Sequence, residues 1–352
     1  MSDCKCQENF SIANGEGLIH FISIIPELNL KIKSVLIELA DVNSKESINT
    51  IKSKNCKEFF EKNYDFFKKN FTLFEQNEVR VFIENDKHKL TINTILKSKQ
   101  LNIFLNYIDD KSFFDILENE ALTTHFQPII DLKDDSIYAY EALTRGVYPD
   151  GTLMSPGELF EKSSRNDTNF KLDRLCRESA LKTSAVKKIN SKVFINFLPT
   201  SIYDPKFCLQ ATVKWAKQLD HDPKNIVFEV VETEKVEDKE HLKTILDYYR
   251  QQGFQVALDD VGEGYSSLNM LVDLQPDIIK VDRNIIDGIH ENSMKQSVYK
   301  ALRTISSDNG IKLLAEGVET IDELNKVKQL GADYAQGYYY AKPTAEPIRS
   351  LS

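Results

Sequence analysis

The stretch IVFEVVETEKVEDKEHLKTILDYYRQQGFQVALDD spans residues Ile226 to Asp260 and decides the fold class. Two short runs in it, Ile226–Val231 and Gln255–Leu258, are rich in β-branched and aliphatic residues, and the segment Glu240–Gln251 between them is helical in pattern. A strand, a helix and a second strand in this order predict a parallel sheet that is covered by helices.

The same alternation continues on both sides of this stretch. Predicted strands precede predicted helices in three further places: Val193–Phe197 before Lys206–Gln218, Asp277–Val281 before Met294–Ser306, and Lys312–Ala315 before Ile321–Leu330. The last helix begins with a capping box, Thr320 and Glu323, and Gly331 follows its end. The pattern starts near Ile116 and runs for about 235 residues, the size of a single (β/α)₈ barrel.

The first part of the chain has a different composition, rich in Lys, Asn and Phe. It contains a predicted strand Leu18–Ile25, an amphipathic helix from Cys56 to about Phe74, a strand Val79–Ile83, and helix or strand pieces within Ile92–Tyr107. These elements predict a small α/β or α+β domain over residues 1–112, followed by the barrel over residues 113–352. No motif in the first domain names a function, and its attachment to the barrel suggests regulation by a ligand or a partner protein.

Composition excludes several classes of protein. The 352 residues are 41% hydrophobic, which excludes wholesale disorder. We find no signal peptide and no apolar stretch of the ~20 residues that a membrane span needs. The net charge of −9 argues against a protein that binds duplex nucleic acid or a membrane surface. Five cysteines fit reduced thiols in the cytoplasm, and Cys4 and Cys6 match no strong zinc pattern, although metal binding there stays an alternative.

Polar side chains occur at or near the ends of seven predicted strands. They are Glu141, Asn196, Glu229, Asp259 with Asp260, Lys280, Glu316 and Gln336. In a barrel the carboxyl ends of the strands meet at one mouth, where active sites lie. A single carboxylate at a strand end is usually a helix cap or part of a surface ion pair, but seven such positions in series predict a functional site.

The chemistry of this set favours divalent metal ions. Five carboxylates that face one cavity repel each other unless cations neutralise them. Oxygen ligands with one Asn carbonyl indicate Mg²⁺ or Mn²⁺ rather than zinc. The adjacent Asp259 and Asp260 suit a bridging position between two metal ions, as in phosphoester hydrolysis. Lys280 is either a charge balancer or a contact to the attacking water or a phosphate oxygen, and we expect Glu319 to hold its ammonium group.

Eight motifs in order give the chain a resemblance to the EAL family of cyclic-di-GMP phosphodiesterases. The motifs are FQPI (Phe126–Ile129), EALTR (Glu141–Arg145), INF (Ile195–Phe197), FEVVE (Phe228–Glu232), DDVGEGYSSL (Asp259–Leu268), IKVDR (Ile279–Arg283), AEGVET (Ala315–Thr320) and AQGYYYAKP (Ala335–Pro343). The resemblance covers roughly residues 115–347 and implies a modified (β/α)₈ TIM-like barrel with one antiparallel strand. Active members of the family cut cyclic-di-GMP to linear pGpG with two Mg²⁺ or Mn²⁺ ions.

The resemblance also implies roles for single residues. One ion would be held by Glu141, Asn196, Glu229 and Asp259, and the other by Asp259, Asp260 and Glu316. Lys280 and Glu319 would help to activate the water, and Glu232 would anchor the loop Gly262–Ser267, which couples dimerisation through the barrel to metal binding. The substrate contacts would be Gln127, Leu143, Arg145, Asp282, Gln336 and Pro343.

Three positions depart from the usual pattern of the family, namely Leu198, Val231 and Val261. None of them is a ligand, but they put the packing of the neighbouring loops in question. Two alternatives to an active cytoplasmic enzyme therefore stay open. One is a catalytically weak or inactive receptor for cyclic-di-GMP, and the other is a scaffold in which residues 1–112 bind a partner protein.

Overall fold

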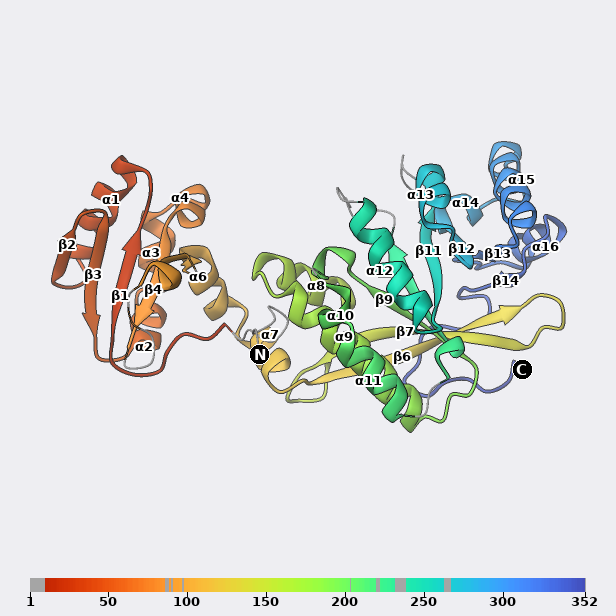
Figure 1. Ribbon diagram of the computed structural model, residues 1–352, viewed down its shortest axis with the longest axis horizontal. Coiled ribbons are helices and arrows are strands. Elements are labelled where there is room, and N and C mark those ends of the chain that lie inside the picture. Colours follow the sequence, from red (N-terminus) through yellow and green to blue (C-terminus); the bar gives the residue numbers. More distant parts are fainter. Residues whose placement is uncertain are drawn as a thin grey trace. The chain divides into compact units, whose positions relative to one another are not determined.

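The structure is a computed structural model of the chain, and it describes residues 10–85, 89, 91–96, 98–202, 204–219, 222–231, 239–262 and 267–351 (Figure 1). It divides into two compact units. The barrel unit contains residues 119–160 and 169–352, and the N-terminal unit contains residues 9–118 and 161–168. Cys4 and Cys6 lie outside the described residues.

The N-terminal unit is built on one antiparallel sheet of five strands in the order β2-β3-β1-β4-β5. The strands are β1 (Gly17–Ile22), β2 (Val42–Lys45), β3 (Ile48–Ser53), β4 (Arg80–Glu84) and β5 (Lys99–Gln100). The helices are α1 (Pro26–Ile37), α2 (Cys56–Lys62), α3 (Tyr64–Asn70), α4 (Leu73–Glu78), α5 (Ile92–Leu96), α6 (Leu101–Asp109) and α7 (Lys111–Glu118). The antiparallel pairing of every strand identifies an α+β unit, one of the two expected types.

The long Phe-rich helix expected from Cys56 to about Phe74 is instead three short helices. Asn63 ends α2 and precedes α3. Phe71 follows α3 and has an extended backbone conformation. Thr72 then begins α4 with a capping box. Asn and Thr side chains compete with the helical backbone for hydrogen bonds, which is why these residues favour helix ends over helix interiors. The hairpin of β2 and β3 was not predicted from the sequence, because β2 is largely polar and exposed and the two isoleucines of β3 lie three residues apart rather than in alternation.

Phenylalanine rings fill the core of the N-terminal unit. Phe60 lies 4.9 Å from Phe104 and 5.8 Å from Phe67, measured between ring centroids. Phe21 of β1 stacks on Phe67 at 5.9 Å, and all of these rings except Phe104, which is 4% exposed, are almost fully buried. The spacing of the rings along the sequence thus marks core positions rather than a cofactor pocket.

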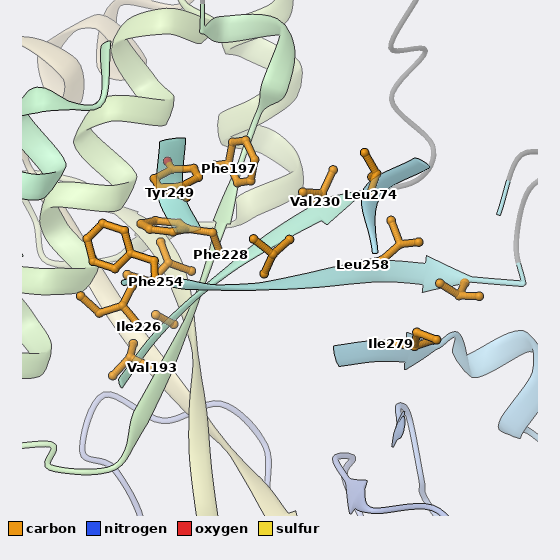
Figure 2. Close-up of a cluster of buried hydrophobic side chains, with 14 of the residues drawn as sticks. Val193, Phe197, Ile226, Phe228, Val230, Tyr249, Phe254, Leu258, Leu274 and Ile279 are labelled. Carbon is orange, nitrogen blue, oxygen red and sulfur yellow. The ribbon is translucent and has the colours of Figure 1, made fainter. Parts of the chain in front are cut away.

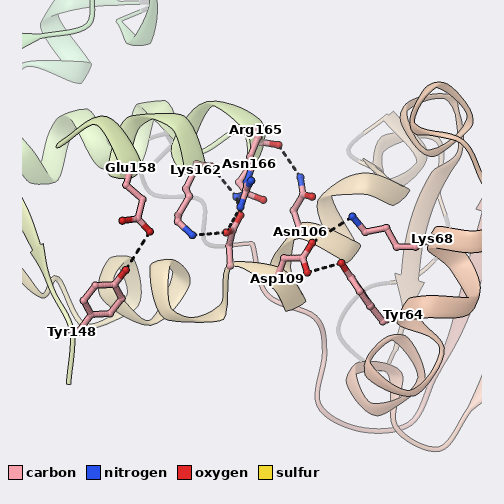
Figure 3. Close-up of polar contacts among 10 residues, drawn as sticks. Tyr64, Lys68, Asn106, Asp109, Tyr148, Glu158, Lys162, Arg165 and Asn166 are labelled. Atoms are coloured by element: carbon pink, nitrogen blue, oxygen red, sulfur yellow. Dashed lines mark hydrogen bonds and ion pairs between the residues drawn. The ribbon is translucent and has the colours of Figure 1, made fainter. Parts of the chain in front are cut away.

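A buried carboxylate ties the end of helix α8 (Pro156–Arg165) into the N-terminal unit (Figure 3). Asp110 is 0% exposed and accepts hydrogen bonds from Lys162 Nζ at 3.0 Å, Arg165 Nε at 2.7 Å and Asn166 Nδ2 at 2.8 Å. Burial opposes ionisation, but these donors prevail and hold the pKa of Asp110 below its ordinary value. The group therefore stays charged at neutral pH.

The barrel unit closes a ring of eight strands. Their order is β6-β14-β13-β12-β11-β10-β9-β7, and β7 pairs with β6 to close the ring, while the short β8 (Leu153–Met154) adds to β7. The strands are β6 (Leu122–Asp131), β7 (Ile137–Val147), β9 (Lys192–Phe197), β10 (Ile226–Val231), β11 (Gln255–Val261), β12 (Ile278–Val281), β13 (Lys312–Ala315) and β14 (Tyr334–Ala335). β6 runs antiparallel to both neighbours, and the other neighbouring pairs of the ring are parallel. The expected modified barrel with one antiparallel strand is confirmed.

Helices follow the parallel strands along the chain. Besides α8 they are α9 (Asn169–Val186), α10 (Pro205–Cys208), α11 (Gln210–Gln218), α12 (Lys239–Gln251), α13 (Ser267–Leu274), α14 (Arg283–Ile286), α15 (Ser293–Asp308) and α16 (Ile321–Gln329). Figure 2 shows the outer core between strands and helices around Phe228. This ring stacks on Tyr249 of α12 at 3.8 Å and meets Phe254 edge-on at 5.2 Å. Within the described residues, no helix is long and apolar enough to cross a membrane.

Candidate active site

The inner layer of the barrel places the site residues. One buried hydrophobic residue from each strand of the ring belongs to this layer: Ile129, Ala139, Phe194, Val227, Ala257, Ile278, Leu314 and Tyr334. Side chains alternate along a strand, so the residue two positions further on faces the same interior. Those residues are Glu141, Asn196, Glu229, Asp259, Lys280, Glu316 and Gln336, and on the reversed β6 the residue two positions earlier is Gln127. The polar residues expected from strand ends therefore form one ring above the inner core.

Lys280 lies among the carboxylates of this ring. Its Nζ atom is 2.5 Å from Glu229 Oε1, 2.7 Å from Glu316 Oε1 and 3.0 Å from Asp259 Oδ1, and it is 3.9 Å from Glu141 Oε1. The lysine side chain is 1% exposed, so bulk water does not solvate its ammonium group. One ammonium group thus faces four carboxylates in a buried site.

This excess of negative charge shifts the pKa values of the site. Burial, helped by Glu141 and Asp259, raises the pKa of Glu229 well above its ordinary value despite Lys280. Burial and then Asp259 do the same for the pKa of Glu316. Burial acts to lower the pKa of Lys280, but the surrounding carboxylates prevail and raise it well above its ordinary value. The protein by itself therefore leaves negative charge that one lysine does not balance.

The donor set fits divalent metal ions. Glu229 is 0% exposed, and Lys280 pairs with its Oε1 atom, while its Oε2 atom accepts no hydrogen bond from the part of the chain that the structure describes. Oxygen atoms of Asp259, Asp260 and Glu316 all lie within 4.8 Å of one another. Carboxylate oxygens that stand this close, beside the buried carboxylate of Glu229, are suitable ligands for Mg²⁺ or Mn²⁺.

Asp260 joins this group through an unusual backbone. Neighbouring residues of a regular strand point to opposite faces, so Asp259 and Asp260 would not share a site in an undistorted β11. Here Asp260 has a φ of 53°, in the left-handed region, and the pairing of β11 with β12 shifts register between Leu258 and Val261. A bulge of this kind re-aims a side chain, and strained residues are common at functional sites.

Amide side chains hold Glu141 in place. Gln336 Nε2 donates to Glu141 Oε2 at 2.5 Å and to Gln127 Oε1 at 3.1 Å. Asn196 Nδ2 donates to Glu141 Oε1 at 3.2 Å, which leaves its carbonyl oxygen for another partner. Glu141 itself lies in the middle of β7, which continues to Val147, so its expected position at the end of a strand is wrong. Its inward direction, set by the alternation along β7, still brings it into the site.

Two cavities adjoin the ring. The first has about 210 Å³ and is lined by polar residues: Gln127, Glu141, Asp282, Arg283, Glu316, Glu319 and Gln336, together with Gly317, Gly337 and Tyr338. The second has about 220 Å³ and is mostly apolar, with Leu143, Phe160, Ile195 and Leu198 among its lining residues. Asn196 and the buried Asp173 also line the second cavity. Asp173 and Arg283 were not predicted as site residues, since neither lies on an inner-layer position of a strand.

The remaining predicted residues lie in varied places. Asp282 lines the polar cavity but also caps α14, accepting from Asn284 N at 2.7 Å. Arg145 lies on β7 beyond Leu143 and donates to Thr144 O at 2.9 Å. Pro343 precedes the residue that bridges to β6 and is not among the residues that line either cavity. Glu232 and residues 263–266 of the predicted loop lie outside the described residues.

Glu319 differs from its expected placement. Its carboxylate pairs with Arg283 at 2.9 Å, whereas the pairs described for Lys280 are with the four ring carboxylates. The expectation that Glu319 holds the lysine ammonium group is therefore wrong for this structure. Glu319 lies two residues beyond Gly317, whose φ is 67°, and lines the polar cavity beside the ring.

Known proteins resemble this chain over the barrel. A standalone EAL protein from Vibrio cholerae O395, solved in a c-di-GMP bound form, is 41% identical with a TM-score of 0.60, covering 66% of this chain and 95% of that one. The probable cyclic di-GMP phosphodiesterase PdeB of Escherichia coli K12 is 28% identical over 231 residues. That alignment covers 65% of this chain and only 44% of the relative.

Solved structures also match both units. The manganese and cy-diGMP complex of BlrP1 from Klebsiella pneumoniae is 21% identical with a TM-score of 0.58, and the match covers 94% of this chain and 96% of that chain. This likeness shows the fold alone, and it extends to the N-terminal unit. The EAL domain profile matches residues 110–343. The chain belongs to the EAL domain family.

Proposed function

We propose that the protein hydrolyses cyclic-di-GMP to linear pGpG in a reaction that uses two divalent metal ions, Mg²⁺ or Mn²⁺. The observation that carries this proposal is the inner ring together with Asp260: five carboxylates, one asparagine and one lysine converge at the mouth of the barrel. The relative PdeB and the Vibrio cholerae structure, through their names, support the dinucleotide as substrate. A receptor without activity is the second candidate, and it would need no complete metal set.

The ring residues would hold the metal ions in two groups. Glu141, Asn196, Glu229 and Asp259 would hold one ion, and Asp259, Asp260 and Glu316 would hold the other. When bound, such ions lower the pKa of a coordinated water and stabilise charge on a phosphoryl group. With two ions the formal charge of the five carboxylates and Lys280 becomes zero, so a phosphodiester anion can enter the site.

The chain's own groups would position the reactants. Lys280, whose ammonium group is held among the carboxylates, would donate a hydrogen bond to the attacking water or to a phosphate oxygen. Gln336 would fix the orientation of Glu141, to which it already donates. The apolar cavity beside Leu143 would take a purine base. Arg145 would contact the substrate near this cavity.

The test is hydrolysis of cyclic-di-GMP by the purified full chain in Mn²⁺, followed by separation of the nucleotides. Glu141→Gln removes one charge and replaces a carboxylate ligand by a neutral amide without changing size, and we expect pGpG formation to fall by at least about 100-fold, as for other groups at a transition state. Glu240→Gln, on an exposed position of α12, is the matched control and should keep wild-type activity. Tight binding without turnover in either metal would favour the receptor.

We further propose that the protein acts in the cytoplasm as a homodimer that forms through the barrel. We also propose that the N-terminal unit regulates the enzyme. The free, buried Cys56, Cys176 and Cys208 agree with a reducing compartment. Sedimentation with and without Mn²⁺ and cyclic-di-GMP tests the dimer. A monomer under all these conditions would contradict it.

A further inference from the structure

The polar cavity beside the ring contains one positively charged side chain, Arg283, among its lining residues. Four carboxylates line the same cavity, those of Glu141, Asp282, Glu316 and Glu319. The guanidinium group of Arg283 forms an ion pair with one of them, because its Nη2 atom lies 2.9 Å from Glu319 Oε1. This pairing connects the start of α14, which follows the lysine-bearing strand β12, to the segment after β13 that begins with Glu316.

The methylene stem of Arg283 supports the same segment. Gly317 has a φ of 67°, and a Cβ atom built there would lie 2.6 Å from Cγ and 2.7 Å from Cβ of Arg283. The backbone of Gly317 therefore lies directly on the stem, and only glycine permits this approach without a shift of the arginine. Arg283 holds the segment twice, by packing under Gly317 and by the ion pair with Glu319.

A buried carboxylate holds the other side of this segment. Glu323 is 4% exposed and accepts hydrogen bonds from Glu319 N at 2.9 Å, Thr320 N at 3.0 Å and Gly288 N at 3.0 Å. Burial alone would raise its pKa, but these backbone donors lower it, so the group remains an acceptor at neutral pH. The segment from Glu316 to Thr320 is thus fixed between Arg283 and Glu323.

We propose that Arg283 is a positioning residue for the hydrolytic reaction, acting through Glu319 and Gly317 to keep the Glu316 carboxylate beside Asp259 and Asp260. A planar guanidinium group can bind a carboxylate while its stem packs on a backbone, whereas the flexible point charge of lysine does both less well. This inference rests on the proposed function, because its consequence is a change in metal binding and turnover. Partners that bond directly to a metal ligand typically contribute 10- to 100-fold to affinity or activity, and because Arg283 is 55% exposed and acts on Glu316 only through its neighbours, we expect effects near the lower end of this range.

The test compares Arg283→Ala, Arg283→Lys, Glu319→Gln and the double variant Arg283→Ala/Glu319→Gln. Binding of Mn²⁺ to each protein without substrate is measured by the loss of the free-ion electron paramagnetic resonance signal. For Arg283→Ala we expect metal affinity to fall about tenfold, with a kcat that also falls about tenfold and a smaller change in KM. Arg283→Lys should restore part of both losses, and the double variant should be no worse than the more damaged single variant, because both act through one contact.

Arg303→Ala is the control. Arg303 makes an ion pair of similar length, 2.7 Å to Asp333, at the opposite end of the barrel strands, and its removal should leave Mn²⁺ affinity and kcat unchanged. A rise in KM alone for Arg283→Ala, or effects of Arg283 and Glu319 that multiply, would overturn the proposal. So would wild-type metal affinity and kcat in Arg283→Ala. If the wild-type protein neither binds Mn²⁺ nor turns over substrate, the proposed function fails instead.

Discussion

At the scale of single residues, Lys280 is the group on which the stability of the site depends. It is buried among four carboxylates, and two of them, in Glu229 and Glu316, have raised pKa values because of burial and mutual repulsion. Removing one partner of a buried ionic cluster leaves charge without compensation, which costs far more than loss of a surface pair. The lysine is therefore expected to stabilise the metal-free protein as well as to serve the reaction.

Lys280→Met keeps the length and apolar volume of the stem and removes the charge. We expect the free energy of unfolding without metal to fall by about 3 to 5 kcal/mol, the usual cost of breaking a buried pair. Urea unfolding in EDTA measures this. Addition of Mn²⁺ should recover a larger part of the stability in the variant than in the wild type, because the ions then compensate the carboxylates. An unchanged unfolding midpoint in EDTA would contradict the role of Lys280 as charge balancer.

Gly337 tests how closely two segments approach next to the site. A Cβ atom at this position would lie 2.0 Å from Val318 O and 2.4 Å from Val318 N, both backbone atoms. Gly337→Ala must therefore displace the neighbouring Gln336, which orients Glu141. We expect the free energy of unfolding to fall by about 1 to 3 kcal/mol and kcat to fall markedly. Gly157→Ala, whose Cβ meets no atom within 4 Å, is the control and should stabilise α8 by about 0.5 kcal/mol.

At the scale of elements, the end of helix α8 depends on Asp110. Three donors from this end of the helix and the residue after it reach its buried carboxylate, and their effect on its pKa outweighs burial (Figure 3). Because the folded-state pKa of Asp110 lies below the unfolded value of about 3.9, the stabilisation is complete above that pH. It is lost as the pH falls through the folded-state pKa.

Asp110→Asn should thus destabilise the N-terminal unit by about 2 kcal/mol or more at pH 7, since hydrogen bonds to a charged group contribute about 1.5 to 3 kcal/mol. The difference in the free energy of unfolding between the wild type and the variant should become smaller at pH 3 and below. Chemical unfolding of both proteins at pH 7 and pH 3 measures the two differences. Equal differences at both pH values would show that the charge of Asp110 contributes nothing.

At the scale of the whole molecule, the two units have separate cores, one of phenylalanine rings and one of barrel strands with their helices. All proposed metal ligands belong to the barrel unit. A ligand that binds only the folded state stabilises it by about 2.7 kcal/mol at 100 times its dissociation constant. Calorimetry of the full chain should therefore show one transition that Mn²⁺ raises and EDTA lowers, and a second that responds to neither. Equal shifts of all transitions would contradict metal binding confined to the barrel.

Much of the barrel was predictable from the sequence because its periodicity is local. Each parallel strand is a short hydrophobic run, and in most of them a polar residue follows an inner-layer residue at a spacing of two, as Ile278 and Lys280 do. The pairing of neighbouring strands in a closed barrel then brings these residues together without further information. The expected ring of Glu229, Asp259 and Glu316 around Lys280 is found in the structure for this reason.

The sequence by itself determined which residue types face the interior of the barrel, since alternation along a strand follows from backbone geometry alone. Tertiary structure decided how Asp260 and Glu319 are placed around the site, which local backbone geometry does not determine. The left-handed backbone and register shift at Asp260 bring a second neighbouring carboxylate into the site, and the turn at Gly317 directs Glu319 to Arg283 rather than to Lys280. Both outcomes depend on contacts between segments that are distant in the chain, so the pattern of residues along one strand could not predict them.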